Sequence, residues 1–414
     1  MVEILFASVA TMLMLATFTG LIRARALGWG VPVWFVVSIL GTELAPRLLV
    51  VQLVLAAVGA WFLDIDSSAV QWGLVCLSLA SLGTLELLRR HFEAGSTFER
   101  ALNTGLGADF REQIPTDRRA TLSHQIRAKE WLRPLKFARD GVKIDRDISY
   151  GPAGKRNLLD IYSPVTAGEN RPVLLQIHGG AWILGHKAEQ ALPLLHHMPL
   201  RGWVVVSINY RLSPRATFPD HIIDVKRAIA WIREHIVEWG GDPDFIAVTG
   251  GSAGGHLTAL AALSANYAPW QPGFEHVDTS LQAALPLYGA YDLCNRFAIR
   301  QNTGIDEPVM KRFMKATQDE DPERYELASP LSWLKPEQPP FFVVQGCNDT
   351  LIWVEEARRF VAEFSEHSGS SLVYAELEGA QHSFDCFHSP RTSHYLNAAA
   401  VWLEWARANH ELKR

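Results

Sequence analysis

Long uncharged stretches alternate with short polar turns over the first 90 residues of the chain. Ile4–Ile22 and Ser67–Leu85 each hold 19 consecutive residues without a charge, which is long enough for a helix to cross a bilayer. Trp29–Thr42 and Leu48–Leu63 are also uncharged but shorter. The pattern predicts a transmembrane module over residues 1–90 with about four helices, two of them short.

A secretory signal followed by a buried helical subdomain is the alternative interpretation of this region. Residues 1–3 carry Glu3 and neither Lys nor Arg, which is unlike a signal peptide, although Ala24-Arg-Ala26 resembles a cleavage site. We therefore prefer the membrane interpretation.

The arginines around the uncharged stretches bear on orientation. With four spans, Arg47, Arg89 and Arg90 lie on the side of the main domain, and Arg23 and Arg25 lie on the other side. Because the positive-inside rule counts only Lys and Arg, three against two places the main domain in the cytoplasm. If the region has three spans instead, the sides of these arginines must be assigned again.

Residues 91–140 are mixed in character and rich in charge. Phe98, Leu102, Leu106 and Phe110 recur every four residues as an amphipathic stripe, and the part that follows is basic. Two interpretations remain open. The segment is either a solvated linker with two helices, or a cap whose stripe covers a site while its basic part rests on anionic headgroups.

From Val142 onward, short strands alternate with helices. Val173–Ile177 and Val204–Ile208 are nearly continuous apolar runs, as expected of strands buried on both faces. The alternation predicts an α/β domain over residues 141–414, with a mostly parallel, doubly wound sheet behind an all-α transmembrane region. Leu293–Leu334 interrupts the alternation with a polar, helix-prone segment, and it is a second candidate for a lid.

Composition excludes some classes of function. The net charge is −5 and no basic stripe is interleaved with aromatic residues, so a nucleic-acid partner is not expected. The four cysteines form neither a metal-binding pattern nor a disulfide framework. A bridge between Cys347 and Cys386 is one interpretation, and free buried thiols are the preferred one.

The most informative stretch is a strand, a sharp turn and a helix around one serine. Phe245–Thr249 has strand character, Gly250-Gly-Ser-Ala-Gly254 follows it, and His256–Leu263 is typical of a helix. Small neighbours let the strand and the helix approach closely around a serine in strained backbone. In this setting the G-x-S-x-G pattern predicts the nucleophile elbow of an α/β-hydrolase fold, with Ser252 as the nucleophile.

A serine nucleophile needs a base and an acid that orients the base. Asp349 follows the predicted strand Phe341–Gly346, and His382 follows the predicted strand Leu372–Leu377, in the chain order required after an elbow serine. Three other carboxylates lie nearby in sequence and are alternatives for the acid: Glu355, Glu356 and Asp385.

Acyl transfer also needs N–H donors for the developing oxyanion. Gly179 and Gly180 follow the strand that ends at Ile177, and the N–H of Ala253 follows the nucleophile. These three groups are predicted to form the oxyanion hole. His178 is expected to hold the loop, and no third ligand supports a metal site at the histidines His196, His197 and His256.

Several segments in order resemble a known family. His178-Gly-Gly-Ala-Trp182, Asn209-Tyr-Arg-Leu-Ser-Pro214 and Gly250-Gly-Ser-Ala-Gly-Gly-His256 resemble the hormone-sensitive-lipase-like esterases of the α/β-hydrolase fold. They are equally similar to the feruloyl-esterase-like and kynurenine-formamidase-like hydrolases. The resemblance covers roughly residues 142–408 and implies Ser252 as nucleophile, His382 as base and Asp349 as its partner. Gly251 departs from many lipase-like members, which carry an acidic residue before the serine.

Together these features predict a membrane-anchored serine carboxylesterase or lipase that hydrolyses acyl esters through an acyl-enzyme. The expected partners are membrane lipids and a lipid-like acyl ester, and the mechanism requires no cofactor and no metal. An amidase or formamidase of the same fold is one alternative. A catalytically silent, membrane-tethered binding protein is another. The sequence leaves the oligomeric state open.

Overall fold

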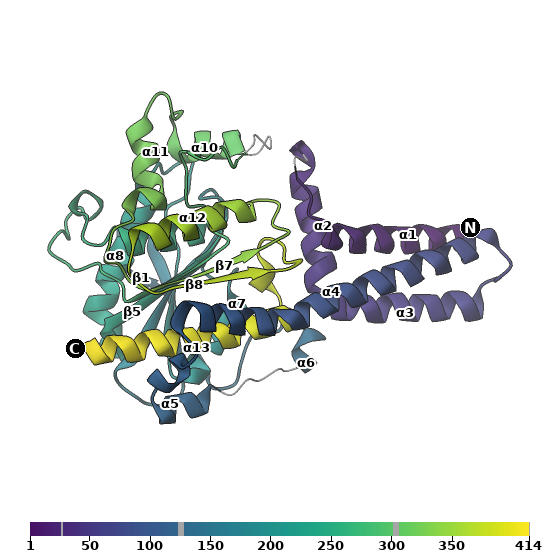
Figure 1. The fold of residues 1–414 in the computed structure, drawn as a ribbon, viewed down its shortest axis with the longest axis horizontal. Helices are drawn as coiled ribbons and strands as arrows, with labels where there is room; N and C mark the ends of the chain where they lie inside the picture. Colours follow the sequence, from purple (N-terminus) through teal and green to yellow (C-terminus); the bar gives the residue numbers. More distant parts are fainter. Residues whose placement is uncertain (26–27, 123–127, 301–305, 414) are drawn as a thin grey trace.

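The computed structural model describes residues 1–25, 28–122, 128–300 and 306–413, and its centre is an eight-stranded sheet (Figure 1). The strand order is β1-β2-β4-β3-β5-β6-β7-β8. The β1–β2 and β2–β4 pairs are antiparallel, and all other pairs are parallel, which confirms the predicted mostly parallel sheet. The strands are β1 (Val142–Ser149), β2 (Leu158–Pro164), β3 (Arg171–Ile177), β4 (Val204–Ile208), β5 (Gly241–Gly251), β6 (Ala283–Leu287), β7 (Phe341–Gly346) and β8 (Leu372–Leu377).

Helices cover both faces of this sheet. Alternate residues of a strand point to opposite faces, so Val173 and Leu175 join one core cluster while Leu174 joins the other. The first cluster contains α8 (Asp220–His235), α9 (Ala253–Leu263) and α12 (Val354–His367). The second contains α7 (Leu192–His197) and α13 (Pro390–Lys413). The remaining short helices are α5 (Thr116–Thr121), α6 (Ala128–Trp131), α10 (Asp306–Met314) and α11 (Pro322–Ala328).

The amphipathic stripe of residues 98–110 packs into the second cluster. Most of the stripe lies within α4, a single helix over Ser68–Leu106 that crosses the expected domain boundary at residue 90. The ring centroids of Phe98 and Phe342 lie 6.2 Å apart, and Leu102 is buried in the same cluster. The stripe is apolar because it covers the sheet beside α13, and this placement contradicts the hypothesis that it covers a site.

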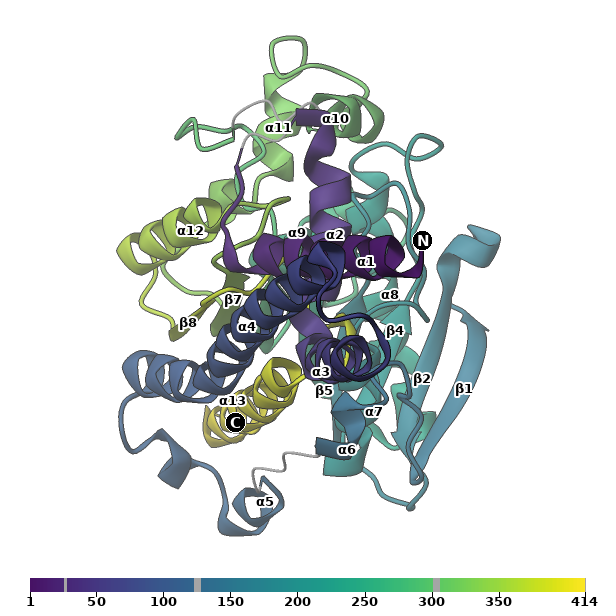
Figure 2. The ribbon, with the colours of Figure 1, turned by 90° about the vertical axis from the view of Figure 1, so that its right-hand side faces the viewer.

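Three helices at the N-terminus are long and apolar enough to cross a membrane: α1 (Val2–Leu21), α3 (Ala45–Phe62) and α4. They project together from the sheet domain, with the N-terminus at the far end (Figures 1 and 2). The fourth expected span forms α2 (Val31–Glu43), whose 13 residues reach about 20 Å, which is too short for a bilayer core of about 30 Å. This helix lies across the end of the bundle, so the prediction of four spans is corrected to three candidates.

The end of α1 is fastened to the sheet domain. Arg23 and Arg25 both pair with Glu355 of α12, and Asn348 donates from Nδ2 to the carbonyl oxygen of Gly20 at 3.1 Å. The placement of these two arginines opposite the main domain is therefore wrong. They lie beside it, because α1 ends at the domain rather than at the far side of the bundle.

Lys226 on α8 is a buried lysine that is expected to make the stability of the fold depend on pH. Its Nζ donates to the carbonyl oxygen of Ser264 at 2.6 Å, and burial lowers the pKa of its ammonium group from 10.5 to about 7. Between these values the unfolded chain binds more protons than the folded chain, so this group makes stability rise with pH. We expect Lys226→Met to remove that part of the increase in melting temperature between about pH 7 and 10. An unchanged slope would contradict the burial effect.

Candidate active site

The predicted elbow has the backbone that an exposed nucleophile requires. Strand β5 ends at Gly251, α9 begins at Ala253, and Ser252 between them has φ 60° and ψ −124°. The N–H of Ser252 donates to the carbonyl oxygen of Leu287 at 3.0 Å, which holds the strained turn against β6. A Cβ added to Gly254 would lie 2.1 Å from the carbonyl oxygen of Ile177, so only glycine permits this approach of helix and strand.

His382 and Asp349 meet at the carboxyl ends of β8 and β7. The Nδ1 atom of His382 lies 2.7 Å from Oδ2 of Asp349, and both side chains are buried. The other carboxylate oxygen accepts the N–H groups of Leu351 and Ile352 at 2.9 and 2.8 Å. These bonds fix the carboxylate, and the carboxylate in turn leaves Nε2 as the nitrogen of His382 that can act on a substrate or nucleophile.

The three alternative carboxylates are engaged elsewhere. Glu355 pairs with the two arginines that follow α1. Glu356 accepts the N–H of Tyr291 at 2.8 Å, and Asp385 accepts the hydroxyl of Tyr288. Among these candidates, the geometry favours Asp349 as the partner of His382.

The glycine loop after β3 lies against the elbow. A Cβ added to Gly179 would lie 3.0 Å from Cβ of Ser252 and 2.6 Å from the carbonyl oxygen of Gly251. The N–H of Gly179 donates to Oε1 of Gln190 at 2.6 Å, so this predicted oxyanion donor is already engaged. Because an N–H group forms one good hydrogen bond, Gly180 and Ala253 remain as the candidate oxyanion donors among the three predicted groups.

Two histidines pack against the segment that holds the glycine loop. His178 stacks on Tyr210 with ring centroids 4.3 Å apart, as its expected holding role requires, and burial lowers its pKa to about 4. His256 accepts the indole N–H of Trp182 at 3.1 Å through Nδ1, while its Nε2 lies 2.7 Å from the carbonyl oxygen of Ala328. Burial also lowers the pKa of His256 to about 4, so both rings are neutral near pH 7.

A pocket opens beside Ser252, and several distant segments line it. The Leu293–Leu334 interval contributes part of the wall, as expected of a lid candidate, mainly through α10. The lining residues are Val31, Ala181, Trp182, Ser252, Ala253, Ala290, Arg300, Asp306, Val309, Met310, Thr350, Leu351, Ile352 and Glu356.

Sequence reasoning missed the contribution of α2 to this site. Val31 lines the pocket, and the ring of Phe35 meets that of His382 edge-on, with centroids 6.0 Å apart. The signal that was missed is the presence of Ser38, Thr42 and Glu43 in an otherwise apolar stretch. The helix buries these polar residues, whereas its apolar residues Val33 and Val36 are exposed. Exposed apolar residues beside buried polar ones mark a surface that contacts another protein, a ligand or a membrane.

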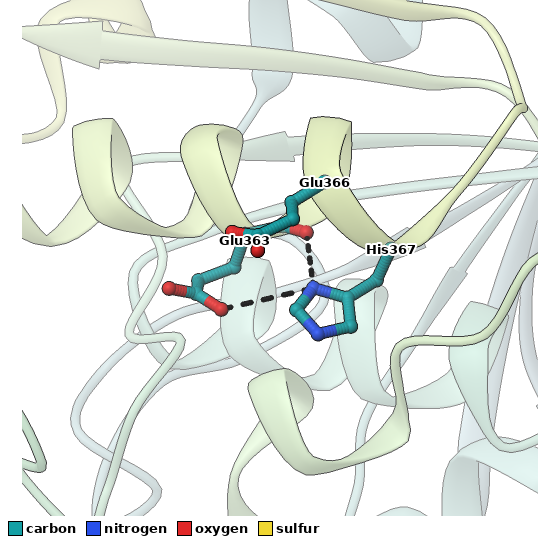
Figure 3. A group of neighbouring side chains, drawn as sticks. All are labelled: Glu363, Glu366 and His367. Carbon is teal, nitrogen blue, oxygen red and sulfur yellow. Dashed lines mark hydrogen bonds and ion pairs between the residues drawn. The ribbon is translucent and has the colours of Figure 1, made fainter.

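Within the described ranges, one group of side chains has metal-ligand spacing. Glu363, Glu366 and His367 lie at the end of α12, where His367 is exposed (Figure 3). Nδ1 of His367 bonds the carbonyl oxygen of Glu363 at 2.9 Å, so the cluster is accounted for by contacts along the helix surface. All four cysteines are free, as expected, but Cys347 and Cys386 are only partly buried, so the prediction that they are buried is wrong.

Comparisons with known proteins identify the family of the chain. A family model described as BD-FAE matches residues 159–364. The probable carboxylic ester hydrolase LipM of Mycobacterium tuberculosis (strain ATCC 25618 / H37Rv) is 44% identical over 339 residues, which are 81% of this chain and 78% of LipM. The chain belongs to the hormone-sensitive-lipase-like esterases. The esterase LipQ of the same organism is 46% identical over 331 residues, which cover 79% of this esterase and 77% of LipQ.

A solved structure gives the same fold. The truncated form of a carbohydrate esterase from gut microbiota superposes with a TM-score of 0.57 and 22% identity, over 64% of this esterase and 98% of that chain. The protein is therefore a carboxylic ester hydrolase of the α/β-hydrolase fold, and its substrate is an ester. The formamidase and silent-scaffold alternatives find no support in these relatives.

Proposed function

We propose that the esterase uses a Ser252–His382–Asp349 triad. Ser252 attacks the ester carbonyl, His382 takes its proton and passes it to the leaving alcohol, and water then releases the acyl group by the reverse sequence. The N–H groups of Gly180 and Ala253 stabilise the oxyanion of each tetrahedral intermediate. The observation that carries this mechanism is the 2.7 Å contact between His382 and Asp349, on the loops that follow β8 and β7.

The substrate proposal follows from the position of α2. This helix contributes Val31 to the pocket and Phe35 to the contact with His382, while its outer residues Val33 and Val36 are 68% and 50% exposed. The helix lies at the root of the three candidate membrane helices. An acyl ester dissolved in the bilayer would thus meet apolar protein surface up to the site, which favours a lipid-like substrate and a membrane-anchored enzyme.

The charges of the loops support a cytoplasmic catalytic domain. With three spans, the N-terminus and the turn between α3 and α4 lie on the far side, where Asp64 and Asp66 are found. Every Lys and Arg within residues 1–90 lies at the near ends of the helices: Arg23, Arg25, Arg47, Arg89 and Arg90. Five positive residues on the near side and none on the far side are a stronger bias than the three against two expected for four spans. This bias also favours a catalytic domain on the cytoplasmic side.

A chain-length series tests the proposal. We expect the full-length esterase in detergent to hydrolyse p-nitrophenyl esters with an optimum at medium or long acyl chains, and to hydrolyse acyl glycerol esters in mixed micelles. Ser252→Ala provides the blank for every substrate. Turnover confined to the shortest, water-soluble esters would contradict the lipid-like substrate. Ester turnover that survives in Ser252→Ala would contradict the serine mechanism.

A further inference from the structure

Tyr288 lies between the nucleophile elbow and the imidazole of His382. It follows β6, has φ 37° and is almost fully buried. Its ring centroid lies 4.6 Å from that of His382, with 56° between the planes. A Cβ added to Gly251 would lie 2.4 Å from the phenol oxygen of Tyr288, so the ring occupies the space that any side chain beside Ser252 would need.

The hydroxyl of Tyr288 is held by a second buried carboxylate in the site. It donates to Oδ1 of Asp385, which lies in the short turn Phe384–Cys386 after His382. Tyr288 also donates its backbone N–H to the carbonyl oxygen of Val344 at 2.8 Å, one strand away. The residue is thus anchored at its backbone and at its hydroxyl, and the ring cannot leave His382 without breaking a buried hydrogen bond.

We propose that Tyr288 and Asp385 are a positioning pair that fixes the imidazole of His382 and stabilises the positive charge it acquires during acyl transfer. The inference rests on the proposed triad and goes beyond it. Asp349 constrains His382 only through Nδ1, within the ring plane. Tyr288 packs against the ring at a centroid distance of 4.6 Å, and Asp385 adds a carboxylate close to the developing imidazolium.

Other groups also face Asp385. Burial raises its pKa, whereas the hydrogen bond from Tyr288 and the charge of His382 lower it. The remaining titratable groups near it come from its own turn, from α13 and from α2: Cys386, Tyr395 and Glu43. Among the described residues, His382 is the group whose positive charge acts on the Asp385 carboxyl.

Removing the hydroxyl alone tests positioning. We expect Tyr288→Phe in the full-length esterase to lower kcat about 10- to 100-fold with KM changed less than about 2-fold, since the ring remains but loses its anchor. Tyr291→Phe is the matched control, because Tyr291 is equally buried three residues later and stacks on Phe360, with centroids 4.2 Å apart. Equal kcat values for the two variants would overturn the proposal.

Removing the charge alone tests electrostatic support. Asp385→Asn keeps an acceptor for Tyr288, so we expect the acidic limb of the kcat/KM profile to move to lower pH by about one unit. An acidic limb at the wild-type position would overturn the role of Asp385. The proposed triad is judged separately, by Ser252→Ala: active wild type, an inactive Ser252→Ala and an unaffected Tyr288→Phe would reject only the positioning pair.

Discussion

Replacing Ser252 or His382 by alanine is expected to lower kcat by about 10⁵- to 10⁶-fold, and combining the two changes is expected to cost little more. In the proposed triad the serine and its base act as one unit, so the loss of either removes the same covalent step. The measurement is kcat for one p-nitrophenyl ester with the wild type, both single variants and the double variant. Multiplicative losses would contradict the shared step.

His388→Gln is the matched control for His382→Ala. His388 lies six residues after His382, is buried to a similar extent, and packs against Phe137 with ring centroids 5.2 Å apart. We expect its replacement to leave kcat within a few-fold of wild type. A large loss in this control would mean that the loop as a whole, rather than the imidazole of His382, had been disturbed.

Replacing Glu43 by alanine is expected to lower the free energy of unfolding by about 3–5 kcal/mol, because it leaves a buried arginine without its counter-charge. Glu43 at the end of α2 pairs with Arg391 at the start of α13, and both side chains are 0% exposed. The hydroxyl of Ser389 donates to the same carboxylate at 2.8 Å. Thermal unfolding in detergent measures the loss.

The matched control is the double variant Glu43→Gln, Arg391→Met. It removes both charges and keeps the two side chains close to their original volumes, so we expect most of the stability to return. Glu43→Ala should also reduce activity, since Arg391 donates to the carbonyl oxygen of Glu378 in the segment that leads to His382. A single variant as mild as the double variant would contradict the importance of this contact.

Much of the catalytic half could be predicted from local patterns. The apolar run Val173–Ile177 required a strand buried on both faces, and the glycines around Ser252 required a tight turn between a strand and a helix. Asp349 and His382 could be selected because loops after parallel strands meet at one edge of the sheet. In each case the determining interactions lie within a few residues.

Contacts between distant segments were decided by the tertiary structure. Periodicity in α4 predicted an apolar stripe, but only packing showed that Phe98 faces Phe342. Gly179 has the sequence position of an oxyanion donor, but its N–H donates to Gln190. The role proposed for Tyr288 depends on its contact with Asp385, 97 residues later in the chain.

The sequence by itself determined the strands, the elbow, the order of the triad candidates and the apolar character of the N-terminal helices. The tertiary structure decided that α2 lies across the bundle with Phe35 on His382, and that Glu43 pairs with Arg391, 348 residues away. The physical reason is that strand, helix and turn preferences arise from neighbouring residues. The partner of a buried polar group or aromatic ring is instead set by which surfaces the whole chain buries together.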